Sequence, residues 1–210
     1  MDKFLGLYAN IKMLEQEEMF RHFFCDLSKM RQQKIEMVKV ASGRRRSLGA
    51  WTLCDYGLRQ WYGLRERDVT IGYGVHGKPF VEGMPQIHFN LSHSGEWVLA
   101  VFAPVEVGCD IQQRIANVRN EQIARRFFAG EEQQAYAAGI DFYRIWARKE
   151  SYLKLTGDGM ALDMRAFSVV EDGNVHFADH TLADYELAAC YANAESLPVM
   201  WMEIDLQKLM

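Results

Sequence analysis

Apolar residues in the first half of the chain switch between helical and extended spacing. Phe4 to Ala9 predicts a strand, and Leu14 to Phe24 predicts a helix because its apolar residues recur at helical intervals. A basic segment follows as a second helix, which we expect to break near Ser42 and Gly43. Arg44 to Trp61 then predicts a longer helix. Strands are expected at Val69 to Tyr73, Ile87 to Leu91, Val98 to Phe102 and Val107 to Ile111.

The second half of the chain repeats this order of a major helix followed by strands. Its clearest helix begins at Asp141, which can cap it, runs to Thr156, and can end at Gly157. Ile145, Trp146 and Leu153 form the predicted buried stripe of this helix. Shorter helices are expected from Ala116 to Phe128 and from Gly130, and strands at Phe167 to Val170, Val175 to Phe177, Leu187 to Tyr191 and Val199 to Ile204.

A faint internal repeat accompanies this order. Trp51 precedes Leu58 by seven positions, and Trp146 precedes Leu153 by the same interval. The pattern predicts an α+β fold built as a pseudo-dimer of two similar halves, residues 1–104 and 105–210. Each half would place one major helix on an antiparallel sheet.

Length and composition agree with a globular protein of one large domain or two halves. The chain has 210 residues, of which 49% are hydrophobic and 25% charged. Its four cysteines contain no CxxC pair, so neither a zinc site nor a disulfide framework is indicated, and we expect reduced thiols in or near the core. No apolar run is long enough for a membrane span, so a soluble cytoplasmic protein is expected.

The charge of the chain is unevenly distributed. The net charge of −4 argues against a general nucleic-acid binder. Between Lys29 and Arg46, however, seven basic residues stand against a single acidic one, Glu36. Two interpretations are open: a solvated helical face, or an anion site suited to a small polyphosphate ligand.

Charged residues in two later segments could form a metal site. Glu150 and Lys154 stand four apart on the predicted helix and share one face, which is typical of an ordinary surface pair as well as of a site. Asp110 and Gln112 project to the same side of a strand, although an Asp at a strand end is often a turn residue. Together Asp110 and Glu150 would offer two hard oxygen ligands, which suit Mg²⁺.

His93 lies between two serines at the end of a predicted strand. It is either a structural histidine bonded to the backbone or a hydrogen-bond donor to a phosphate.

In chain order, these segments resemble the surfactin-synthetase-activating type of 4′-phosphopantetheinyl transferase. The resemblance covers nearly the whole chain and rests on the basic N-terminal helix with R-S-L, G-K-P, F-N-L-S-H-S-G, G-x-D-I, R-F-F and W-x-x-K-E-S-x-x-K. It implies a pseudo-dimer of two α+β halves with coenzyme A in the cleft between them. It also implies Mg²⁺-dependent transfer of the 4′-phosphopantetheine arm to a serine of an apo acyl or peptidyl carrier protein, by a monomer, with release of 3′,5′-ADP.

The resemblance assigns roles to individual residues. Glu150, Lys154 and His93 would be catalytic, and Asp110, Gln112 and Glu150 would be the metal positions. Gln112 departs from the commonest pattern, in which a second acid follows the Asp. The residues expected to bind coenzyme A are Arg31, Lys34, Arg45, Arg46, Ser47, Lys78, Ser92, His93, Asp110, Glu150 and Lys154.

A carrier protein would present an acidic helix, so we expect a docking surface on residues 113–128. Positive charge there comes from Arg114, Arg119, Arg125 and Arg126, and Phe127 or Phe128 would be an apolar anchor. The alternative is that both phenylalanines are core, and we expect that at least one of them is. Two alternatives remain open: a metal-dependent hydrolase of coenzyme A or another nucleotide, and a non-catalytic carrier-binding relative.

Overall fold

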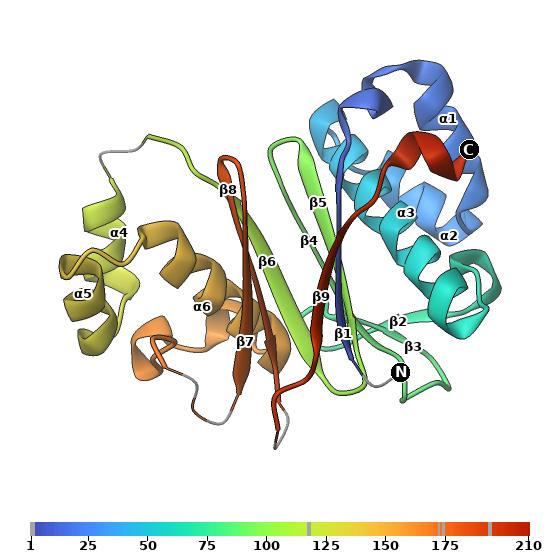
Figure 1. Ribbon diagram of the computed structural model, residues 1–210. Helices are drawn as coiled ribbons and strands as arrows, with labels where there is room; N and C mark the ends of the chain where they lie inside the picture. Colours follow the sequence, from blue (N-terminus) through green and yellow to red (C-terminus); the bar gives the residue numbers. More distant parts are fainter. Residues whose placement is uncertain (1–2, 117–118, 172, 174, 193–194) are drawn as a thin grey trace.

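The computed structural model describes residues 3–116, 119–171, 173, 175–192 and 195–210. Its two main sheets pack face to face, and helices cover their outer faces (Figure 1). The helices are α1 (Glu17–Asp26), α2 (Lys29–Glu36), α3 (Ala41–Tyr62), α4 (Asn120–Phe127), α5 (Gly130–Ala137) and α6 (Phe142–Thr156). The strands are β1 (Phe4–Asn10), β2 (Ile71–Tyr73), β3 (Pro79–Val81), β4 (His88–Ser94), β5 (Trp97–Ala103), β6 (Val107–Gln113), β7 (His176–Leu182), β8 (Tyr185–Tyr191) and β9 (Val199–Glu203).

The first sheet has the strand order β4-β5-β1-β9. β1 pairs antiparallel with β5 on one side and parallel with β9 on the other. The predicted division into residues 1–104 and 105–210 stays a prediction, but the structure places β9, from the second segment, in the sheet of the first.

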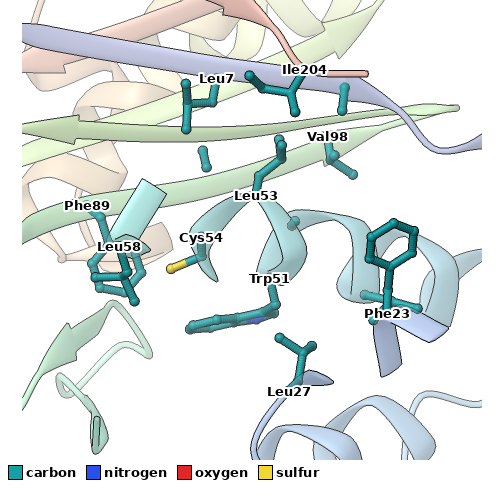
Figure 2. Packing of buried hydrophobic residues seen from close by; sticks show 14 of the residues in the cluster. Leu7, Phe23, Leu27, Trp51, Leu53, Cys54, Leu58, Phe89, Val98 and Ile204 are labelled. Atoms are coloured by element: carbon teal, nitrogen blue, oxygen red, sulfur yellow. The ribbon is translucent and has the colours of Figure 1, made fainter. Parts of the chain in front are cut away.

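α3 packs on the outer face of this sheet. In Figure 2, Leu53 of α3 points toward the sheet, where Leu7 of β1 and Ile204, the residue after β9, lie. Trp51 lies on the other side of α3, near Leu27. Leu53 and Leu7 are fully buried. Because a fully buried leucine contributes roughly 1.5–3 kcal/mol, this packing fixes α3 and the basic residues at its start against the sheet.

The second sheet has the order β6-β8-β7, and α6 packs on β6 and β8. Leu99 and Val101 of β5 share an apolar cluster with Cys109 and Ile111 of β6, which fills the space between the two sheets. Because side chains alternate along a strand, Asp110 faces the opposite way, toward α6.

These layers confirm the α+β class. Each of the two larger sheets carries one long helix on its outer face, α3 or α6. The similarity of the two halves, and with it the pseudo-dimer, stays a prediction. Within the described ranges, none of the helices is long and apolar enough to cross a bilayer.

The break predicted in the basic segment is in the wrong place. α2 ends at Glu36 and α3 already begins at Ala41, so Ser42 and Gly43 lie in the first turn of α3. The backbone N–H groups of a first turn have no intrahelical partner in any case, so weak helix formers are tolerated there.

The strand predicted at Phe167 to Val170 is also wrong. Side chains of neighbouring helices bind its backbone groups in place of a partner strand. Lys149 donates to the Phe167 carbonyl (3.0 Å), Arg148 donates to the Val169 carbonyl (2.9 Å), and Glu132 accepts from the Val169 N–H (3.0 Å). The polar groups of this segment are therefore satisfied without a sheet.

No disulfide joins the four cysteines, all of which lie in the described ranges. Cys54, Cys109 and Cys190 are buried, as predicted, whereas Cys25 is exposed on α1 and not in the core.

Candidate active site

α6 begins and ends where its sequence predicts. The Asp141 carboxylate accepts hydrogen bonds from the backbone N–H groups two and three residues later, at 2.9 and 3.2 Å. At the other end, Gly157 adopts a φ of 73°, a conformation that favours glycine. Between these caps, Glu150 and Lys154 lie one turn apart and on one face.

The backbone of β6 lies directly against the backbone of α6 at Gly108. A Cβ atom at Gly108 would lie 2.1 Å from the carbonyl oxygen of Ser151 in α6, so a larger residue would collide there. Asp110 follows two residues later and faces the same helix. Glycine at position 108 therefore lets α6 bring Glu150 and Lys154 close to Asp110.

The charges of these three side chains are coupled. Lys154 Nζ lies 2.6 Å from Asp110 Oδ1, and Asp110 is only 4% exposed. Burial opposes the charge on Lys154, but the attraction of Asp110 outweighs it and the pKa of Lys154 is raised. Burial, and then repulsion from Asp110, raise the pKa of Glu150, with Lys154 acting against this rise.

β4 contributes two neighbouring polar residues. Ser92 Oγ donates to Asp110 Oδ1 at 2.8 Å and accepts from Lys154 Nζ at 2.9 Å. His93 lies on the same side of the strand as Phe89 and Leu91, which pack in or against the core under α3, and on the opposite side from Ser92. Desolvation by the surrounding residues, and then the charges of Arg46 and Lys154, lower the pKa of His93.

A cavity of about 430 Å³ connects the basic N-terminal helices with these residues. Its walls include Arg31, Ser47, Ser92, His93, Asp110 and Lys154. The Arg31 guanidinium carbon lies 3.3 Å from the centroid of the Trp51 ring, and Arg31 also donates to the Tyr73 hydroxyl at 2.6 Å. Arg31 Nε also lies 3.5 Å from the buried Glu66 carboxylate, so this oriented guanidinium offers an anion only the charge that Glu66 leaves uncompensated.

An adjoining cavity of about 300 Å³ contains Lys78, Glu150 and Lys154 in its lining. Lys78 Nζ donates to the Leu155 carbonyl at 2.9 Å and pairs with the carboxylate of Glu106. Lys154 lines both cavities, so the two cavities form one continuous polar site. This site lies between α6 and the neighbouring strands β4 and β6.

Comparisons with known proteins point to one family. The family model for the 4′-phosphopantetheinyl transferase superfamily matches residues 106–197. The 4′-phosphopantetheinyl transferase Sfp of Bacillus subtilis (strain 168) is 32% identical over 181 residues, which cover 82% of this chain and 79% of that protein. The 4′-phosphopantetheinyl transferase psf-1 of Bacillus pumilus is 33% identical over 78% of this chain and 72% of that protein.

The chain belongs to the 4′-phosphopantetheinyl transferase superfamily.

Most of the residues expected to bind coenzyme A meet at the two cavities of this transferase. Arg46 lies close enough to His93 to affect its pKa, and Lys34 Nζ lies 3.4 Å from the centroid of the Tyr73 ring at the cavity wall. Arg45 instead pairs with Glu15 at 3.3 Å. The roles of all these residues in binding stay predictions.

The donor set of the transferase fits a magnesium ion. Burial, and then the charge of Asp110, raise the pKa of Glu150, and a divalent cation held by both carboxylates would relieve their repulsion. Among the described residues, no cluster of three or more His, Cys, Asp or Glu side chains could hold a metal ion, so the magnesium site stays a prediction that rests on two carboxylates. Gln112 donates its amide to Asp110 Oδ2 at 2.7 Å, so its role as a ligand through oxygen stays a prediction.

Sequence reasoning missed a buried ion pair behind the site. Lys149 Nζ lies 2.7 Å from both carboxylate oxygens of Glu132, and both side chains are fully buried. The signal was in the sequence, because Lys149 is four residues from both Ile145 and Leu153 and so lies on the predicted buried stripe. This pair joins α5 to α6 on the side of the helix away from Asp110.

Glu106 was also missed. It pairs with Lys78 and lies 3.0 Å from His88 Nδ1, and these partners lower the pKa of Glu106 against the opposing effect of burial. An isolated glutamate in a turn carries no sequence signal of this kind, so only the tertiary structure reveals it.

Proposed function

We propose that this transferase moves the 4′-phosphopantetheine arm of coenzyme A to a serine of an apo acyl or peptidyl carrier protein and releases 3′,5′-ADP. The observation that carries the proposal is the convergence of Asp110, Glu150 and Lys154 beside a cavity lined by Arg31 and His93. The names of the relatives, 4′-phosphopantetheinyl transferases, support it.

The nucleotide end of coenzyme A would lie in the larger cavity. Arg31 is held by Trp51 and Tyr73 with its charge in the wall, and Ser47 and His93 add hydrogen-bonding groups. These groups would bind the 3′-phosphate, because charge-assisted hydrogen bonds to phosphate oxygens are among the strongest available.

The chemical step is in-line displacement at the β-phosphorus. The carrier serine oxygen forms the new P–O bond, the bond to the 3′,5′-ADP oxygen breaks, and Glu150 accepts the serine proton directly or through a water. Lys154, held by Asp110, neutralises charge on the transferred phosphoryl group.

Asp110 and Glu150 would hold Mg²⁺, which when bound neutralises the pyrophosphate of coenzyme A. The serine nucleophile belongs to the carrier, so the transferase itself needs none.

The function is tested by intact-mass analysis of candidate apo-carriers incubated with the protein, coenzyme A and Mg²⁺. We expect each carrier molecule to gain one phosphopantetheine, with one equivalent of 3′,5′-ADP released. EDTA should abolish the reaction, and excess Mg²⁺ should restore it.

A carrier whose acceptor serine is replaced by alanine is the matched control. If 3′,5′-ADP appears as fast with that carrier, or with no carrier at all, the protein is a hydrolase and the proposal is wrong.

Carrier docking is proposed on α4 and the segment before it. Arg125 and Arg126 are exposed, and Phe127 is half-buried against Trp146, with ring centroids 5.8 Å apart. Phe128 is fully buried, which confirms that one of the two phenylalanines is core. Arg119 also lies on this surface, whereas residues 117 and 118 of the expected docking segment are outside the described residues.

Reversing the charge of Arg126 should weaken carrier binding. We expect Arg126→Glu to raise KM for an acidic carrier several-fold while kcat stays within about twofold, because exposed charges mainly steer encounter. The difference in KM between Arg126→Glu and the wild-type protein should shrink in 0.5 M salt, because screening shortens the range of the charge. Arg21→Glu on α1, which is 76% exposed, is the control. Equal KM values for the two variants would contradict this docking surface.

Cytoplasmic location, the monomeric state and the absence of nucleic-acid or membrane partners stay predictions.

A further inference from the structure

β4 and β6 belong to different sheets but lie side by side (Figure 1). Side chains of alternate β4 residues bind the backbone of alternate β6 residues. Asn90 Oδ1 accepts from the Cys109 N–H at 3.2 Å, Ser92 Oγ from Ile111 N–H at 3.4 Å, and Ser94 Oγ from Gln113 N–H at 3.1 Å. We call these three contacts the β4–β6 seam.

Ser92 differs from the other two seam residues because it also contacts the reacting charges. Its hydroxyl donates to Asp110 Oδ1 and accepts from Lys154 Nζ, in addition to its bond with the Ile111 N–H. A serine hydroxyl has one hydrogen to donate and two lone pairs to accept with. All three are used, and Ser92 is only 7% exposed. With these three contacts in place, the hydroxyl has no further hydrogen bond to offer a nucleotide.

We propose that Ser92 is a positioning residue, which fixes Asp110 and Lys154 relative to each other and to the seam, and is not a ligand of coenzyme A. This inference rests on the proposed function for its kinetic consequence. Asp110 comes from β6 and Lys154 from α6, so Ser92 ties both to β4, whose next residue, His93, lines the nucleotide cavity. The hydroxyl thereby sets the distance between the phosphate-binding wall and the reacting centre.

Ser94 provides a matched control in the chain itself. It makes the same kind of seam bond, to the Gln113 N–H, at a similar distance. Among the described residues, its hydroxyl makes no hydrogen bond to Asp110 or Lys154. A role in the seam alone would therefore give Ser92→Ala and Ser94→Ala equal effects, whereas a positioning role would separate them.

Steady-state kinetics with a carrier test the proposal. We expect Ser92→Ala to lower kcat by about 10- to 100-fold, the scale of a misplaced reacting group, with KM for coenzyme A within about twofold. Ser92→Thr, which keeps the hydroxyl, should recover most of kcat, and Ser94→Ala should stay within about threefold of the unchanged protein. Calorimetry with 3′,5′-ADP should give Kd values for Ser92→Ala and the unchanged protein within about twofold.

Two results would overturn the proposal. A tenfold weaker Kd for 3′,5′-ADP in Ser92→Ala with little change in kcat would make Ser92 a nucleotide ligand. Equal loss of kcat in Ser92→Ala and Ser94→Ala would make it a structural seam residue.

A double-mutant cycle on unfolding tests the contact between Ser92 and Asp110 even if the wild-type protein has no transferase activity. We expect the effects of Ser92→Ala and Asp110→Ala on the unfolding equilibrium constant to depart from multiplicativity by about fivefold or more. The cycle of Ser94→Ala with Asp110→Ala should be multiplicative within about twofold. Absence of transfer would refute the proposed function alone, whereas a multiplicative Ser92 cycle would refute the contact on which this inference depends.

Discussion

Glu150→Gln lowers kcat for carrier modification by at least about 10²-fold, the usual scale for removing an acid–base or electrostatic group. Gln keeps the volume of Glu150 but can neither accept the serine proton nor contribute a negative charge to a metal site. Activity is measured by release of 3′,5′-ADP in the presence of an apo-carrier and Mg²⁺. Glu131→Gln, an exposed position on α5, should retain full activity.

The same substitution should not destabilise the metal-free protein. Burial and Asp110 raise the pKa of Glu150, so the folded state binds its proton more tightly than the unfolded state does. Ionisation of Glu150 therefore costs folding free energy, and this cost develops as the pH rises from the unfolded pKa of about 4.3 through the raised folded pKa. Below that window the cost is absent.

Urea unfolding in EDTA at several pH values measures this effect. We expect Glu150→Gln to be as stable as the unchanged protein at low pH and more stable at neutral pH. Loss of activity together with loss of stability at neutral pH would contradict the repulsion between Glu150 and Asp110. Retention of more than a tenth of kcat would contradict the role of Glu150 as base and ligand.

Lys149→Ala should lower the free energy of unfolding by about 3–5 kcal/mol, because it leaves the fully buried Glu132 carboxylate without its cation. Glu132 still accepts from the backbone N–H groups of Ala129 and Val169, which partly satisfies it. Urea denaturation measures the loss. Lys208→Ala, at a side chain that is 82% exposed, should change stability by no more than about 0.5 kcal/mol.

Replacing both residues of the ion pair by neutral ones separates the effect of the uncompensated charge from the effect of lost packing. Lys149→Met combined with Glu132→Gln removes both charges, keeps an apolar stem at position 149 and retains one acceptor oxygen at 132. We expect this double variant to be more stable than Lys149→Ala alone. If the double variant is the less stable of the two, the ion pair itself stabilises the fold and the argument from an uncompensated charge is wrong.

Local rules were sufficient to predict α6 from the sequence. A capping Asp141, a terminating Gly157 and an apolar period of three to four residues are all set within the helix, and the structure follows them. The shared face of Glu150 and Lys154 follows from the same geometry. That Asp110 meets this face depended on the resemblance, because two carboxylates 40 positions apart carry no local signal of contact.

Tertiary contacts override the same rules elsewhere. The apolar residues of the segment around Val169 predicted a strand, but side chains of α5 and α6 bind its backbone, and sequence spacing cannot show this. The saturated hydroxyl of Ser92 is likewise visible only when β4, β6 and α6 are assembled.

The parallel pairing of β1 with β9 has a consequence for synthesis on the ribosome. The partner of β1 along one edge, Val199–Glu203, is made some 190 residues after β1 itself. Until then that edge of β1 is open, and an unpaired strand edge invites pairing with other chains. A nascent chain would therefore hold an incomplete first sheet until β9 is made, a period in which a chaperone could shield it.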